Sequence, residues 1–115
     1  MTGMQGRQFT PIATTLAFRF APVVNVWRNS LNPLLVIGDD AVTIRISRQT
    51  IIPFDGLEPV QALRFVGHQL RFRRPGEWLE RTAFFYSRAE TVAALEALVA
   101  AGAPVAPEAL RRYGL

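Results

Sequence analysis

The stretch LRFRRPGEWLERTAFFYSRAETVAALEALV (residues 70–99) contains two kinds of apolar periodicity. In its first part, Leu70 and Phe72 alternate with arginines, so the apolar side chains should face a core and the arginines should face water. The following RPGE segment (74–77) has typical turn residues. We therefore predict a hairpin whose strands cover 69–74 and 78–86.

The periodicity changes at Ser87. Ser87 and Glu90 have the spacing of a capping box, in which the hydroxyl accepts a hydrogen bond from the Glu90 amide. Apolar residues then recur three or four positions apart, which predicts a helix over 88–101 that Gly102 and Pro104 end. The apolar stripe of this helix consists of Val92, Leu95, Leu98 and Val99.

Alternation also dominates the chain before residue 70. VTIRIS (42–47) places its apolar residues on one face, and LAFRFA (16–21) should turn its leucine and both phenylalanines inward. GDD (38–40) and Gly67 supply turn signals between strands. With the hairpin above, the predicted strands cover 15–22, 34–38, 41–47, 49–53, 60–66, 69–74 and 78–86.

These elements predict a mainly β domain of about seven antiparallel strands and one C-terminal α-helix. One helix cannot cover a flat sheet of that size, so the sheet must curl into a β-barrel or fold into a sandwich that the helix caps. Residues 23–33 either extend the first strand or form a long connection, and we expect 107–115 to add a short turn of helix from Pro107. We expect a flexible N-terminal leader over 1–10 and a single domain over 11–115.

The composition excludes several kinds of site. The chain has 115 residues, no cysteine and one histidine, which rules out disulfides, thiol catalysis, thiolate metal sites and clustered imidazole sites. All 13 basic residues are arginine, and a net charge of +4 gives only mild attraction to anionic partners. No apolar run is long enough to span a membrane. We expect a cytoplasmic protein that folds without cofactor or metal.

Several segments resemble a bacterial pleckstrin-homology-like (PH-like) domain. In that family, a hairpin with a Gly-Asp-Gly-like turn precedes a segment of spaced apolar residues, and a second hairpin leads into the helix. The likeness spans residues 15–101. The segments that carry it are NPLLVIGDDAVTIRI (32–46), IIPFDGLEPVQAL (51–63), LRFRRPGEW (70–78) and AFFYSRAETVAALEALV (83–99), with Ile51, Phe54, Leu57 and Val60 as the spaced apolar residues.

The resemblance implies a scaffold of seven antiparallel strands capped by a helix, and it implies no reaction. Eukaryotic relatives often bind phosphoinositides through basic residues of the first hairpin loop. The loop at 38–40 is acidic here and the chain has no lysine, so that binding pattern is not transferred. Bacterial members are more often associated with homo-oligomers or with membrane-associated or stress-related partners.

Four arginines are candidates for binding an anionic ligand. Arg71 and Arg73 share the outer face of one strand, Arg74 follows at the turn, and Arg45 would join them if its strand lay alongside. Such a patch could hold a lipid headgroup at a membrane surface, whereas nucleic acid is not favoured as a partner. The competing interpretation is a solvated face whose arginines pair with glutamates 77 and 80.

The segment bracketed by Pro53 and Pro59 should be an edge strand or a bent strand, because proline lacks the donor that a sheet ladder needs. An exposed edge can accept another chain by strand addition or dock a second copy of itself. The residues expected at this interface are Ile51, Ile52, Phe54 and Leu57.

No residue set predicts a catalytic site. His68 is expected to be a surface or turn histidine, and Trp27 and Trp78 are expected in the core. A small enzyme with Tyr86 or His68 as acid or base is the least favoured hypothesis. We expect a non-enzymatic module that acts through protein–protein contact and forms a homo-oligomer. The alternative is a binder of an anionic ligand, lipid headgroup or nucleic acid, through the four arginines.

Overall fold

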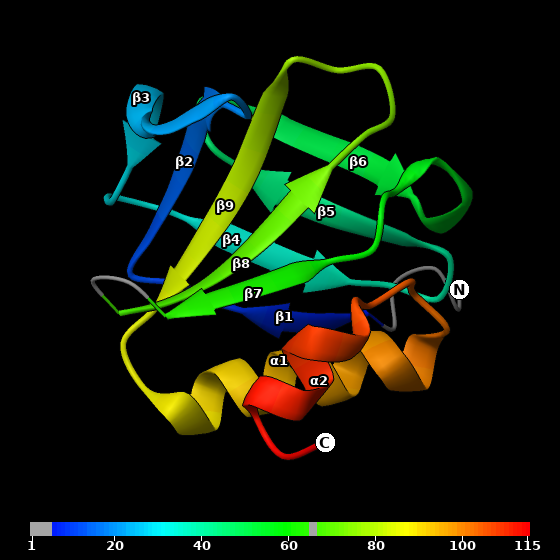
Figure 1. The fold of residues 1–115 in the computed structure, drawn as a ribbon. Coiled ribbons are helices and arrows are strands. Elements are labelled where there is room, and N and C mark those ends of the chain that lie inside the picture. The colour runs from blue at the N-terminus through cyan, green and yellow to red at the C-terminus, as the bar shows by residue number, and fades with distance from the viewer. Residues whose placement is uncertain (1–5, 65–66) are drawn as a thin grey trace.

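The computed structural model describes residues 6–64 and 67–115, and for residues 22–25 it describes the backbone alone. These residues form two sheets and two α-helices (Figure 1). The four-stranded sheet has the order β1 (Arg7–Phe9), β4 (Leu34–Ile37), β5 (Ala41–Arg45) and β6 (Gln49–Pro53). The five-stranded sheet has the order β3 (Ala21–Asn29), β2 (Ala13–Phe18), β9 (Leu79–Phe85), β8 (His68–Arg73) and β7 (Gln61–Arg64).

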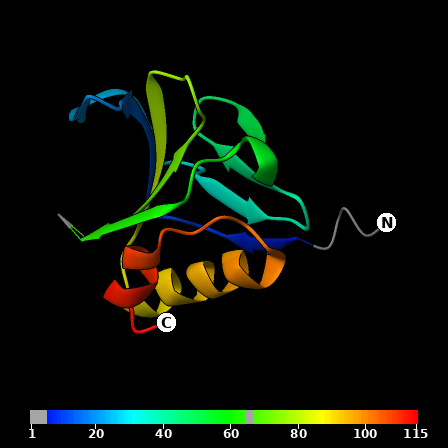
Figure 2. The same cartoon turned by 45° about the vertical axis from the view of Figure 1, so that its right-hand side comes forward.

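Both sheets are antiparallel throughout, so the predicted mainly β class is confirmed. Within the described ranges no strand of one sheet pairs with a strand of the other, so the sheets pack as two layers and do not close into a barrel. The helices α1 (Arg88–Ala101) and α2 (Pro107–Arg112) lie together across one end of the two layers (Figure 2).

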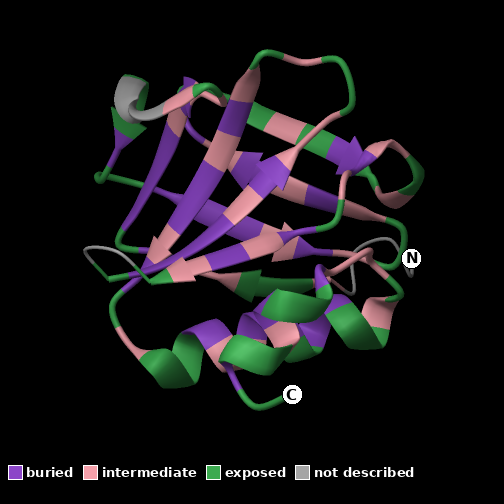
Figure 3. Cartoon of the chain, in the orientation of Figure 1, coloured by how far each residue is buried: buried purple, intermediate pink, exposed green. Residues whose placement is uncertain are grey.

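The core lies between the two sheets and against α1 (Figure 3). Alternate side chains of each strand enter it, as the two-residue period of a strand requires. The large side chains that are fully buried there are Leu35, Ile44 and Ile52 from the four-stranded sheet, Leu70, Phe72 and Phe85 from the five-stranded sheet, and Leu95 and Leu98 from α1.

Three predicted hairpins are confirmed. The GDD turn joins β4 to β5, Gly67 lies between β7 and β8, and the RPGE turn joins β8 to β9. Gly67 has a φ of 94°, a conformation that glycine adopts without the steric cost of a side chain. The edge strand predicted for the segment around Pro53 and Pro59 is confirmed in part: β6 is the last strand of its sheet, but Phe54–Gly56 form a short 3-10 helix, η2, rather than a strand.

The N-terminal region differs from the flexible leader expected over 1–10. Residues 1–5 lie outside the described residues, but Arg7–Phe9 form β1, which pairs with β4 at the edge of the four-stranded sheet. The Phe9 ring packs edge-on against Phe85 of the core at a centroid distance of 6.4 Å. This segment is therefore held by one aromatic contact and by the pairing of three residues with β4. Such interactions leave no periodic apolar pattern in the sequence, so the strand was not predicted.

The strand predicted over 15–22 is two strands, β2 and β3, because the chain turns at Arg19 and Phe20. Phe20 is 71% exposed, so its predicted inward orientation is wrong. Residues 23–33 are mostly β3, which is a separate strand rather than an extension of the first or a long connection. The buried residues of β2 are small, and they are Ala13, Thr14, Thr15 and Ala17.

The predicted helix over 88–101 is confirmed as α1. The Glu90 amide donates to Ser87 Oγ at 3.1 Å, and Gly102, with a φ of 88°, ends the helix. Val99 is 50% exposed, so the apolar stripe is rotated from the predicted one. Small residues allow this face to pack closely; the buried residues of α1 are Thr91, Ala94, Leu95, Ala97 and Leu98.

The short helix expected from Pro107 is confirmed as α2, which has proline in its first turn. It covers the edge strand β7, and Val60 just before that strand exchanges backbone hydrogen bonds with the segment that leads into α2. Of the helices in the described ranges, neither has the length and apolar character that crossing a bilayer demands.

Candidate functional site

Arg71 and Arg73 lie on the outer face of the β8–β9 hairpin, and Arg74 lies at its turn. Arg73 Nε donates to Glu80 Oε1 at 2.7 Å, and Arg71 Nε lies 3.4 Å from Glu80 Oε2 without forming a hydrogen bond. The carboxylate of Glu80 is 1% exposed. Burial lowers the pKa of Arg71, Glu80 raises it and Arg73 lowers it further, so this guanidinium is the least satisfied member of the cluster.

A second ionic cluster lies at the turn of the same hairpin. Glu77 accepts hydrogen bonds from Arg74 at 2.8 Å and from Arg81 at 2.7 Å. Burial alone would raise the pKa of Glu77, but the hydrogen bonds and charges of the two arginines outweigh it and lower that pKa. A third pair, Arg19 with Glu58 at 2.7 Å, borders the cluster.

Arg45 is separated from the other three candidate arginines. It lies on β5 of the four-stranded sheet, where its guanidinium donates to the Asn32 carbonyl at 3.4 Å. The structure therefore brings Arg71, Arg73 and Arg74 together on one hairpin, each beside a glutamate, and places Arg45 on the other sheet. The self-pairing with glutamates 77 and 80 that the sequence indicated is confirmed.

The predicted interface residues on and after β6 divide into two groups. Ile52 and Leu57 are buried in the core. Phe54 is half-buried, and Ile51 is 64% exposed in the middle of the strand. Only Ile51 and the rim of Phe54 can therefore contact another molecule directly, while Ile52 and Leu57 hold the strand in place.

Among residues 6–64 and 67–115, no strand pairs with the free side of β6. Phe54 N donates to the Asp40 carbonyl at 2.8 Å, on the β5 side. Main-chain groups of an antiparallel strand alternate in direction, so Thr50 and Ile52 also bond toward β5. The amides of Gln49 and Ile51 and the carbonyl of Pro53 consequently point to the free edge, since β5 is the strand neighbour of β6 in the described structure.

An apolar row crosses the outer face of the four-stranded sheet next to this edge. Val36, Thr43 and Ile51 lie in register on β4, β5 and β6. With the Gly38–Asp40 turn they line a shallow hollow of about 310 Å³. The row places β-branched side chains beside a free strand edge, an arrangement suited to packing against another protein surface.

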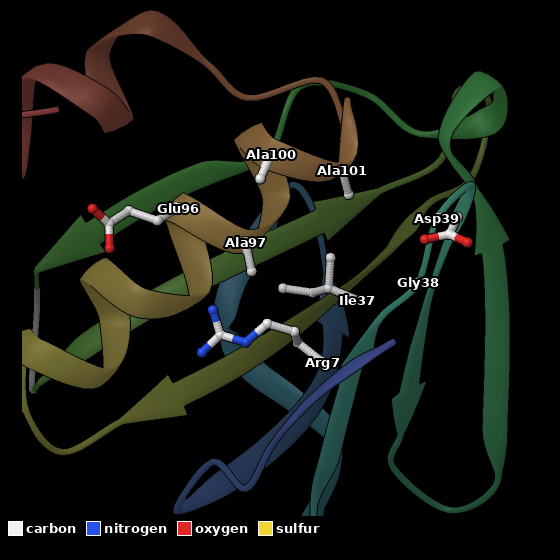
Figure 4. Close-up of a pocket in the computed structure, with 8 residues that line it drawn as sticks. All are labelled: Arg7, Ile37, Gly38, Asp39, Glu96, Ala97, Ala100 and Ala101. Carbon is white, nitrogen blue, oxygen red and sulfur yellow. The ribbon is translucent and has the colours of Figure 1, made fainter. Parts of the chain in front are cut away.

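A second hollow, of about 380 Å³, lies between α1 and the strands β1 and β4 (Figure 4). Arg7 projects toward the small residues of α1, while Asp39 and Glu96 lie at opposite ends of the hollow in this view. The charged groups do not converge on one point. Across the described residues, no group of three or more His, Asp or Glu side chains could hold a metal ion.

His68 is buried, so the prediction of a surface or turn histidine is wrong. It begins β8 and is 9% exposed, and its Nδ1 lies 2.6 Å from the hydroxyl of Tyr113, a buried residue that follows α2. Burial lowers the pKa of His68, and Arg64 and Arg88 lower it further, so the environment favours the neutral form of the ring. Sequence spacing did not indicate this partner because it lies 45 residues away.

Several large aromatic side chains are exposed, and the predicted core positions of Trp27 and Trp78 are wrong. Trp27 on β3 is 55% exposed and Trp78 is 72% exposed. Trp78 packs edge-on against Phe20 at a centroid distance of 6.3 Å, so these two rings shield each other at one end of the sheet. Tyr86, the other candidate acid or base, is 83% exposed just after β9.

No family model matches the sequence, and no curated protein is significantly similar to it.

Proposed function

We propose that this chain is a non-enzymatic interaction module that self-associates by pairing its β6 edge with β6 of a second copy. The observation that carries the proposal is the position of Ile51, a large apolar residue that is 64% exposed at the centre of an unpaired strand edge. Removing such a side chain from water is favourable by roughly 1–2 kcal/mol, and a second copy supplies the same side chain at the same place.

An antiparallel pair with its two-fold axis at Ile51 uses the free backbone groups well. The amide and carbonyl of Ile51 would bond reciprocally to those of the second copy. The amide of Gln49 would donate to the Pro53 carbonyl of the second copy, but Pro53 has no amide to donate in return to the Gln49 carbonyl, so the ladder ends there. Proline thus limits the ladder to a short segment without leaving an unsatisfied group in its centre.

The charges at the ends of β6 favour the antiparallel orientation. Exposed Arg48 precedes the strand and exposed Asp55 follows it. Antiparallel pairing sets Arg48 of each copy near Asp55 of the other, whereas parallel pairing would set like charges together. The preference is electrostatic, so it should weaken as salt increases.

We also propose that the chain is a PH-like domain and that it acts in the cytoplasm. Its two antiparallel sheets followed by a C-terminal helix support the PH-like scaffold that the sequence resembles. The arginine hairpin supports the alternative function, anion binding, less well. Arg71 and Arg73 share the carboxylate of Glu80, and Arg74 shares that of Glu77 with Arg81, so each of these arginines already has an anionic partner inside the protein.

A cross-linking experiment tests the pairing directly. The chain has no cysteine, so Ile51→Cys introduces a single thiol. A short bifunctional thiol reagent should convert this variant to covalent dimer, and Trp27→Cys, exposed on the edge strand of the other sheet, should remain monomeric. Equal cross-linking of the two variants, or none of either, would count against pairing at β6.

A further inference from the structure

Three arginines lie near the buried pair formed by His68 and Tyr113. Arg64, at the end of β7, is the direct cross-strand neighbour of His68, so the two side chains share a face of the sheet. Arg88 donates to the Tyr113 carbonyl at 3.1 Å, with its guanidinium 5.1 Å from the centre of the tyrosine ring. Arg112 immediately precedes Tyr113 at the end of α2.

These arginines lack carboxylate partners of the kind that the arginines of the β8–β9 hairpin have in Glu77 and Glu80. Among the residues that the structure describes, none of the three forms an ion pair, although five other arginines do. The acidic residues on the same helices, Glu90, Glu96 and Glu108, are exposed, and Glu90 is engaged by Ser87. The result is a local concentration of positive charge to which the described part of the chain supplies no ion-pair partner.

The site is also preorganised. Arg88 occupies the first turn of α1, where a cation is disfavoured by the helix dipole, yet its side chain is held on the tyrosine ring and carbonyl. The amino-terminal end of α1 and the three guanidinium groups therefore all contribute positive potential at one place. An oxyanion bound there would relieve the repulsion between these groups.

We propose that Arg64, Arg88 and Arg112 bind a phosphate group over the His68–Tyr113 pair. Guanidinium groups bind phosphate oxygens through paired, charge-assisted hydrogen bonds, and three of them more than offset the charge of about −2 on a phosphate monoester. Arg88 uses one donor on Tyr113 and keeps others available. This inference concerns a different part of the chain from β6 and does not rest on self-association.

The single histidine provides the readout. Arg64 and Arg88 face His68 from β7 and α1, and Arg112 faces Tyr113 from α2, so a bound dianion would offset their effect and raise the pKa of His68. An NMR titration of the His68 ring protons against pH, with and without inorganic phosphate, should show this rise.

Three variants distinguish phosphate binding at this site from nonspecific attraction of phosphate to a basic protein. Arg64→Gln and Arg112→Gln, both at exposed positions, should each weaken phosphate binding about tenfold, the loss expected for a charge-assisted contact. Arg111→Gln, which neutralises the neighbouring exposed arginine of α2, should change it less than about twofold.

Two further measurements show whether the site binds phosphate at all and whether that phosphate belongs to a lipid headgroup or to a free monoester. Stronger binding of vesicles containing phosphatidic acid than of soluble glycerol phosphate would assign the phosphate to a lipid headgroup, and the reverse preference would assign it to a free monoester. An unchanged His68 titration in phosphate, or equal losses in Arg111→Gln and Arg64→Gln, would overturn the proposal.

Discussion

Arg73 Nε lies 2.7 Å from Glu80 Oε1, and this contact belongs to a carboxylate that is almost completely buried although it projects from the outer face of a sheet. The side chains of Arg71 and Arg73 cover it, with exposures of 17% and 20%. A carboxylate removed from water in this way needs its partners, because the cost of burying a charge is otherwise uncompensated.

Replacing Glu80 should therefore destabilise the fold. Glu80→Gln leaves two arginines facing each other without a carboxylate, and we expect the free energy of unfolding to fall by about 2 kcal/mol, less than for a pair buried throughout. Urea unfolding followed by circular dichroism measures the change. Glu58→Gln, which breaks the more exposed pair with Arg19, should cost less than about 1 kcal/mol. Equal losses would show that Glu80 is an ordinary surface residue.

Glu77 should make the stability depend on pH in the acid range. Burial acts to raise its pKa, but hydrogen bonds from Arg74 and Arg81 outweigh that effect, so the pKa is lower in the folded chain than in the unfolded chain. Its contribution is therefore full above the ordinary carboxyl value of 4.5 and is lost as the pH falls through the lowered folded value.

The measurement is urea unfolding at a series of pH values between neutral and acid. Glu77→Gln should be less stable than the unmodified chain at neutral pH, and the difference should shrink as the medium becomes acid. Glu96→Gln, at an exposed position on α1, should track the unmodified chain at every pH. A constant difference between Glu77→Gln and the unmodified chain would contradict the pKa argument.

The hydrogen bond between Tyr113 and His68 should stabilise the docking of the C-terminal helix. Tyr113→Phe keeps the ring but leaves His68 Nδ1 buried without its partner, at a cost of about 1–2 kcal/mol. Tyr86→Phe makes the same chemical change at a residue that is 83% exposed, and it should alter stability by less than about 0.5 kcal/mol. Indistinguishable unfolding curves for the two variants would mean that the buried contact contributes nothing.

The sequence predicted those elements whose signals are local. The β8–β9 hairpin depends on a Pro-Gly turn between alternating residues, and α1 depends on Ser87 and Gly102 at its two ends. These are interactions between residues close in the chain, which a single sequence records directly. The edge position of β6 was predictable for the same reason, because Pro53 lacks a donor.

The remaining features depend on residues that are distant in the chain or small. The buried face of β2 consists of alanine and threonine, so a search for large apolar residues placed Phe20 inside when it lies at a turn. His68 is buried because α2 brings Tyr113 against it, and no spacing in the sequence records that contact. Arg45 could join the other arginines only if its strand lay in the same sheet. The sheet to which a strand belongs is a property of the topology, and the local sequence does not record it.

The central claim is that two copies of the chain pair through β6 at Ile51, and sedimentation equilibrium over a wide range of protein concentration tests it most directly. The unmodified chain should show a reversible monomer–dimer equilibrium. Ile51→Lys should sediment as a monomer, because it sets like charges opposite each other at the two-fold axis. Val99→Lys, which alters a half-exposed residue of α1, should retain the dimer. A monomer at every concentration of the unmodified chain would contradict the account.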